Sequence, residues 1–160
     1  VEFCKQAQAQ FPYHISYSCG DAHTLPFEPK KFDVVINVEA SHLYSDLGKF
    51  FGEVARVLKN EGFCLLADYR KTNKRARAME TFYKQASQAG FIVQAERDIT
   101  GNVTEACRLD SPRRAALIHK APRLVQPYLR DYCAISGTKK FDKFHRKKRY
   151  YFFMKLGKRA

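Results

Sequence analysis

Apolar and polar residues follow one another along the chain in patterns that predict alternating strands and helices. Residues Phe32–Val38 are almost all apolar and mostly β-branched, which is typical of a strand buried on both faces of a parallel sheet. Tyr44–Leu58 then has apolar residues at helical spacing, and Ser45 and Asp46 suit the start of that helix, as cap and as favourable charge for its dipole. A left-handed stop at residues 60–62 and a second buried strand at Phe63–Ala67 are expected next.

The same alternation continues beyond the second strand. Residues 73–89 predict an amphipathic helix that ends at Gly90, and Phe91–Glu96 predicts another strand. Shorter apolar segments at His14–Cys19 and Tyr150–Leu156 predict a first and a last strand. Strands that alternate with helices of this length form βαβ units, so we expect an α/β fold with a mostly parallel sheet.

Residues 98–149 break this rhythm. They predict one or two helices over Val103–His119 and a further short helix over Leu124–Ala134. Helices inserted before the last strand would lie over the carboxyl edge of the sheet, where a substrate lid belongs. At the other end of the chain, residues 3–9 have the spacing of the end of a helix.

Charge is distributed unevenly between the two parts of the chain. The net charge is +13, and the whole excess lies after residue 105, with the highest density over Lys139–Arg149. Such a block attracts nucleic acid, an anionic membrane surface or an acidic ligand, or is simply a solvated face. Because the segment contains no recognisable RNA- or DNA-binding motif, nucleic acid receives the least weight as a partner.

The five cysteines are scattered and never occur in C-x-x-C spacing. This pattern predicts reduced thiols in a cytoplasmic protein and no metal site. No apolar run in the sequence approaches the ~20 residues of a membrane-spanning helix. The chain begins at Val1 without an initiator methionine, which leads us to expect a fragment or a processed start.

Two polar segments follow predicted strands and carry side chains that could take part in binding or catalysis. In G-D-A-H-T-L-P-F, the carboxylate of Asp21 can accept a hydrogen bond from an exocyclic amine while a neighbouring N–H faces a ring nitrogen, the pair that recognises adenine. In N-V-E-A-S-H, His42 is the side chain best able to take a proton near pH 7. Each also has a plainer interpretation, because Asp21 suits an ordinary turn and His42 could cap the next helix or fill a polar pocket.

These two segments, with the helix–turn–strand E-V-A-R-V-L-K-N-E-G-F-C-L-L-A-D, resemble the second half of class I S-adenosylmethionine-dependent methyltransferases. The residues of the second segment resemble those of the methyltransferases that methylate hydroxyls of lipids and other natural products. The resemblance implies an α/β, Rossmann-like methyltransferase sheet that is N-terminally truncated. Residues 1–160 would form one partial domain, with residues 98–149 as a basic, helical insertion on its substrate side. The implied activity is methyl transfer from S-adenosylmethionine to a hydroxyl of a small molecule or lipid.

The resemblance also implies roles for individual residues at the two strand tips. Cofactor binding would fall to six of them: Asp21, Ala22, His23, Asn37, Val38 and Glu39. His42 is the candidate catalytic base, and Glu39 would either orient its imidazole or hold the substrate. Residues 68–70 lie at the next strand tip, where they would line the substrate site or form a solvated loop.

One hallmark of the family is missing from the sequence. No two glycines are separated by a single residue, so the chain contains no G-x-G loop. We therefore expect the central strands to expose one side and the cofactor to bind weakly to this chain alone. Two other functions stay open: a catalytically inactive methyltransferase-like fragment that acts through protein contacts, and a nucleic-acid-directed methyltransferase or binding module. The sequence leaves the methyl acceptor and the oligomeric state undetermined.

Overall fold

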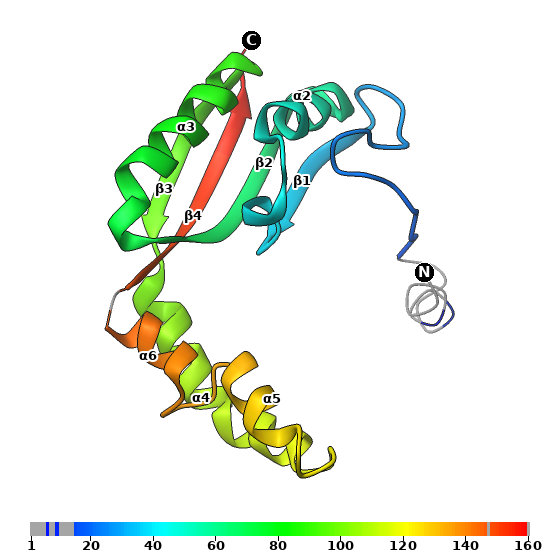
Figure 1. The fold of residues 1–160 in the computed structure, drawn as a ribbon. Coiled ribbons are helices and arrows are strands. Elements are labelled where there is room, and N and C mark those ends of the chain that lie inside the picture. The colour runs from blue at the N-terminus through cyan, green and yellow to red at the C-terminus, as the bar shows by residue number, and fades with distance from the viewer. Residues whose placement is uncertain (1–5, 7–8, 10–14, 147, 160) are drawn as a thin grey trace.

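The computed structural model describes residues 6, 9, 15–146 and 148–159, so the helix end predicted at residues 3–9 lies mostly outside the described residues. The described part contains a four-stranded sheet with the order β1-β2-β4-β3 (Figure 1). Its strands, in chain order, are β1 (Phe32–Val38), β2 (Leu58–Lys71), β3 (Phe91–Asp98) and β4 (Arg149–Lys158). The predicted α/β fold is confirmed.

The sheet is mixed in this part of the chain: β1, β2 and β3 run in the same direction, as expected for a mostly parallel sheet, and only β4 is reversed. β1 and β2 are parallel, but β4 lies between β2 and β3 and is antiparallel to both. The helices that precede β4 stay beyond the edge at which β3 ends (Figure 1). The chain therefore re-enters the sheet at the same end at which β3 left it, so β4 has to run in the direction opposite to β3.

Two helices, α2 (Leu47–Val57) and α3 (Arg75–Gln88), pack on the sheet and close its core. Their apolar residues, among them Phe51 and Phe82, meet alternate residues of β2 and β4, because successive side chains of a strand point to opposite faces. Asp46 caps α2 by accepting a hydrogen bond from the Lys49 amide at 3.0 Å. Gly90 ends α3 with a φ of +86°, as its position in the sequence predicts.

The turn predicted at residues 60–62 is wrong, because β2 starts at Leu58 directly after α2. The backbone at Leu58 is already extended, with φ −74° and ψ 139°. Gly62 has a different purpose in this strand. A Cβ atom at Gly62 would approach the carbonyl oxygen of Asp33 in β1 to 3.0 Å, so the glycine permits the two strands to lie close together.

β1 forms an open edge of the described sheet, which overturns its predicted burial on both faces. Val34, Ile36 and Val38 are 36%, 68% and 58% exposed. The strand predicted over His14–Cys19 is also wrong from Ile15 onward, since these residues have no strand conformation. A strand persists only where a neighbour completes its backbone hydrogen bonds, and no described strand lies beside this segment. The expected exposure of one side of the sheet is confirmed.

Three helices lie between β3 and β4 in the chain: α4 (Thr100–Ile118), α5 (Gln126–Tyr132) and α6 (Lys139–His145). α4 is a single helix that continues through Pro112. Figure 1 shows the three helices gathered beyond one edge of the sheet, where β3 ends and β4 begins. Among the described residues, no helix is long and apolar enough to cross a membrane.

Candidate active site

The chain reverses sharply after β1 and places a histidine over the end of β2. The Glu39 amide continues the ladder by donating to the carbonyl of Ala67 at 2.8 Å. Glu39 then adopts a left-handed backbone with a φ of +51°, an uncommon conformation for a residue other than glycine. The short 3₁₀ helix η1 (Ser41–Leu43) follows and presents His42. This strained turn is where the predicted site residues leave the sheet.

Asp68, near the carboxyl end of β2, is fully buried and holds this turn in place. Its carboxylate accepts hydrogen bonds from the Ser41 hydroxyl, from the His42 amide at 2.9 Å and from the Tyr69 amide at 2.8 Å. Its Oδ1 also lies 2.8 Å from Nδ1 of His42. An ionised carboxylate can only accept, so Nδ1 carries a proton, and in the neutral form of the ring Nε2 is then the acceptor.

The surroundings of Asp68 keep its carboxyl group ionised. Burial by itself disfavours the charged form, but the hydrogen bonds from Ser41, Tyr69 and His42 and the Arg70 guanidinium outweigh it and lower the pKa of Asp68. Nη1 of Arg70 lies 3.2 Å from Oδ2 of the carboxylate. The interpretation of residues 68–70 as a solvated loop is therefore wrong for Asp68.

His42 lines a cavity of about 520 Å³ between the end of the sheet and the helical segment. Nε2 of His42 lies 3.4 Å from the hydroxyl of Tyr69, and the two rings lie 4.6 Å apart. The opposite wall comes from α4, α5 and α6 and includes Val103, Tyr132 and Phe144. His42, in contact with the buried carboxylate of Asp68, is thus placed at a cavity that the helices line from the opposite side.

Glu39 also lines this cavity, but its partner is another residue. The Tyr151 hydroxyl donates to Oε1 of Glu39 at 2.6 Å. Burial, together with this carboxylate, raises the pKa of Tyr151, so the phenol stays protonated and keeps donating. Glu39 was expected either to orient the imidazole of His42 or to hold the substrate. The residue that contacts the imidazole is Asp68, not Glu39. Sequence reasoning missed this role of Asp68, although an acid at the end of a buried strand signals a polar site.

The residues predicted to bind the adenine form a separate, more exposed group. The carboxylate of Asp21 is exposed and accepts from the His23 amide at 2.8 Å and lies 2.9 Å from Nδ1 of His23. The backbone hydrogen bond from His23 is the main reason that the pKa of Asp21 is lowered. The His23 ring lies edge-on to Tyr44 at 5.8 Å, and Tyr44 accepts a hydrogen bond from Nδ2 of Asn37 at 2.7 Å.

These contacts link the acidic loop to the tip of β1. Ala22 packs against the hydrophobic core, whereas Val38 is exposed on the open edge of β1. The carbonyl oxygen Oδ1 of Asn37 is buried and has no hydrogen-bond partner among the residues that the structure describes. A buried acceptor without a donor is costly, and it marks a place where a ligand N–H group can bind.

Comparison with known proteins relates the whole arrangement to one family. A family model described as a methyltransferase domain matches residues 1–66. A fatty-acid O-methyltransferase of Mycolicibacterium smegmatis is 55% identical over 114 residues, which are 71% of this chain and 40% of that protein. A phthiotriol/phenolphthiotriol dimycocerosates methyltransferase of Mycobacterium leprae is 32% identical over 139 residues, which are 86% of this chain and 49% of that protein.

A solved structure supports the same relationship at the level of the fold. An O-methyltransferase from a trans-AT PKS multienzyme of Brevibacillus brevis, in complex with S-adenosyl-L-homocysteine, superposes with a TM-score of 0.70. It is 19% identical, and the match covers 99% of this chain and 55% of that one. The chain belongs to the class I methyltransferase family. This methyltransferase chain spans about half the length of the curated relatives it matches.

The cofactor of class I methyltransferases is S-adenosylmethionine. The hydrogen-bond acceptors of this chain can be compared with the hydrogen-bond donors of that cofactor. S-Adenosylmethionine carries an exocyclic amine on adenine and an ammonium group on its methionine part. The carboxylate of Asp21 in the acidic loop is one hydrogen-bond acceptor, and Oδ1 of Asn37 in β1, unpaired among the described residues, is another. The residues present therefore fit the nitrogen donors of the cofactor.

Proposed function

We propose that the protein transfers a methyl group from S-adenosylmethionine to a hydroxyl oxygen of a lipid-like acceptor. The observation that carries this proposal is the His42–Asp68 pair at a cavity walled by the inserted helices. The names of two relatives add support, since one is a fatty-acid O-methyltransferase and the other a phthiotriol dimycocerosates methyltransferase. In the alternative, a methyltransferase-like chain without catalysis, Asp68 would have only the structural role of holding the turn at Ser41–Leu43.

His42 is the base in this proposal. Asp68 holds Nδ1 and fixes both the tautomer and the orientation of the ring, so that Nε2, which the Tyr69 hydroxyl faces at 3.4 Å, is the atom that would take a proton. An acceptor hydroxyl in the cavity would donate its proton to Nε2 as its oxygen attacks the methyl carbon. General-base assistance of this kind contributes ~10²–10⁴-fold, and most of the remaining acceleration comes from positioning the reacting atoms with water excluded.

The cofactor would be held by six residues, three in the acidic loop and three at the end of β1. When bound, S-adenosylmethionine supplies an electrophilic methyl group on a sulfonium. Asp21 would accept from the adenine amine, with Ala22 and His23 beside it, and Asn37 would accept from the methionine ammonium. Val38 and Glu39 complete the set at the end of β1. In this proposal Glu39, fixed by Tyr151, lies between the cofactor and the acceptor cavity.

The inserted helices have a defined role in the proposal. Residues 98–149 would form a substrate-side insertion within a single domain over residues 1–160, and they would cover the acceptor and exclude water. Arg114, Lys140 and Arg149 line the cavity from this side and would favour an acceptor that carries negative charge. We also retain the cytoplasm as the proposed location, on the basis of the scattered cysteines.

Calorimetric titration with S-adenosylmethionine, followed by a methyl-transfer assay, tests this function. The purified chain is first titrated with the cofactor and is then incubated with a long-chain alcohol and the cofactor, with detection of the methyl ether by mass spectrometry. Saturable cofactor binding and ether formation are the expected results. A folded chain that neither binds the cofactor nor methylates the alcohol would contradict the proposal and favour the non-catalytic alternative.

A further inference from the structure

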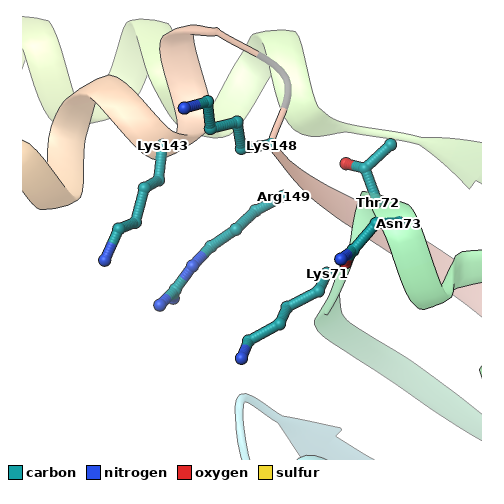
Figure 2. Close-up of a pocket in the computed structure, with 6 residues that line it drawn as sticks. All are labelled: Lys71, Thr72, Asn73, Lys143, Lys148 and Arg149. Carbon is teal, nitrogen blue, oxygen red and sulfur yellow. The ribbon is translucent and has the colours of Figure 1, made fainter.

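A second cavity, of about 620 Å³, lies where β2 ends and β4 begins. Figure 2 shows the residues that line it: Lys71, Thr72, Asn73, Lys143, Lys148 and Arg149. Four of them are cationic, and no acidic residue is in the set. The four cations come from three separate parts of the chain: Lys71 ends β2, Lys143 lies in α6, and Lys148 directly precedes Arg149 at the start of β4. We call this set of four cations the basic pocket.

The fold places like charges opposite each other at the base of the basic pocket. Lys71 and Arg149 are direct partners in the antiparallel β2–β4 ladder. Like charges directly opposite on neighbouring strands destabilise a sheet. Within the described residues, none of the four cations forms an ion pair that would relieve the repulsion. A bound anion with more than one negative charge would relieve it.

Arg149 is held in the basic pocket by two aromatic rings. Its guanidinium lies 4.5 Å from the centre of the Tyr69 ring and 5.4 Å from that of Phe144, so its plane is fixed by two aromatic contacts. Its Nη1 is buried and lacks a hydrogen-bond partner in the described part of the chain. A positioned, unpaired guanidinium N–H beside lysine ammonium groups is the arrangement that binds phosphate oxygens.

Arg149 also connects the basic pocket to the acceptor cavity, because it lines both. A molecule whose phosphate lies in the basic pocket can therefore extend past Arg149 towards His42. We propose that the basic pocket binds a phosphate or diphosphate group carried by the methyl acceptor, at some distance from the oxygen that is methylated. This inference rests on the proposed function and adds a substrate class to it, namely phosphate-bearing lipid-like acceptors.

Titration with inorganic pyrophosphate at low ionic strength tests the site itself. The probe is titrated by calorimetry into the wild-type chain, a Lys71→Gln/Lys143→Gln double variant and a Lys49→Gln control. Lys71 and Lys143 are exposed, so the double variant keeps its fold, which circular dichroism verifies. Lys49 is an exposed lysine of α2 outside the basic pocket. We expect the double variant to bind at least about tenfold more weakly and the control to bind like the wild type.

Pyrophosphate binding that is absent in the wild type, or equal in all three proteins, would overturn the inference. Vesicles of phosphatidylglycerol are compared in parallel. Binding to these vesicles that depends on Lys71 and Lys143, without pyrophosphate binding, would assign the pocket to a membrane surface and would also overturn it.

Two matched acceptors separate the phosphate site from the proposed reaction. Dodecanol and 12-hydroxydodecyl phosphate have the same reacting hydroxyl, but only the second has a phosphate. We expect a KM at least about tenfold lower for the phosphorylated alcohol, and this preference should disappear in the double variant. Equal KM values would overturn the inference while leaving methyl transfer intact. Lysine-dependent pyrophosphate binding in a protein that methylates neither alcohol would support the phosphate site and contradict the proposed function.

Discussion

The acceptor side and the cofactor side of the proposed site differ in how far the described residues enclose them. On the acceptor side, Asp68 is fully buried and fixes His42 through two hydrogen bonds. On the cofactor side, Asp21 is exposed, and Ile36 in the neighbouring strand is 68% exposed. The difference shows that the chain itself fixes the position of the proposed base, whereas Asp21 and Val38, two of the residues proposed to bind the cofactor, lie exposed.

The comparison predicts its largest effect at Asp68. Asp68→Ala leaves the buried donors of Ser41, His42 and Tyr69 without an acceptor, and it leaves Arg70 without its carboxylate. We expect the free energy of unfolding to fall by about 3–5 kcal/mol, measured by urea denaturation. Asp21→Ala is the matched control on the exposed side and should unfold like the wild type. Equal stability of all three proteins would remove the contrast between the two sides.

The two strands at the site should respond differently to loss of an apolar side chain. Leu66 of β2 is fully buried, so Leu66→Ala should lower the free energy of unfolding by ~2–5 kcal/mol. Ile36 of β1 is largely exposed, and Ile36→Ala should cost less than about 1 kcal/mol. Urea denaturation of both variants measures the difference. A large loss at Ile36 would show that the β1 edge is covered in solution.

Low pH should lower the free energy of unfolding through Asp68 on the acceptor side, in a defined pH range. The pKa of Asp68 is lower in the folded chain than in the unfolded one, because its hydrogen bonds outweigh its burial. Its ionised form therefore stabilises the fold above the unfolded pKa of ~3.9, and this contribution is lost as the pH falls through the folded pKa. Denaturation of wild type and Asp68→Asn at several pH values should give a stability difference that is constant from pH 7 to about 5 and shrinks below about 4. A difference that is independent of pH would mean that the pKa of Asp68 is the same in the folded and the unfolded chain.

The smallest expected effect is at Asp21 and concerns binding alone. Asp21→Ala should weaken S-adenosylmethionine binding about tenfold, because one acceptor for the adenine amine is lost. Asp33→Ala is a suitable control, since it removes an exposed carboxylate whose partner is Lys59. Calorimetry measures both affinities. An unchanged affinity in Asp21→Ala would exclude this residue from the cofactor site.

Local patterns in the sequence predicted individual elements well. Ser45 and Asp46 were expected at the start of α2, and Asp46 caps it through its side chain, while Gly90 ends α3 through its left-handed backbone. Both signals depend only on neighbouring residues. Long-range relationships were not predictable in the same way. The position of β4 between β2 and β3 depends on where the inserted helices release the chain, and no local pattern encodes it.

In the candidate site, too, the local feature was predictable and the long-range contact was not. His42 stands out in the sequence because few side chains take up protons near pH 7. Its contact with Asp68 joins residues 26 positions apart and depends on the parallel pairing of β1 with β2, in which Val38 lies opposite Ala67. The apolar residues of β1 predicted burial, but their exposure is decided by whether a second strand lies beside them. That information is outside the segment itself.

The most direct test of the account is the effect of His42→Gln on two acceptors of equal length, a long-chain alcohol and a long-chain carboxylic acid. An alcohol needs a base to accept its proton, whereas a carboxylic acid is already ionised at pH 7. We predict that the methyl-transfer rate with the alcohol falls ~10²–10⁴-fold. The rate with the acid should fall less than about tenfold, because only a positioning contact is lost. An equal fall for both acceptors, or no fall for either, would contradict the assignment of His42 as the base that Asp68 holds in place.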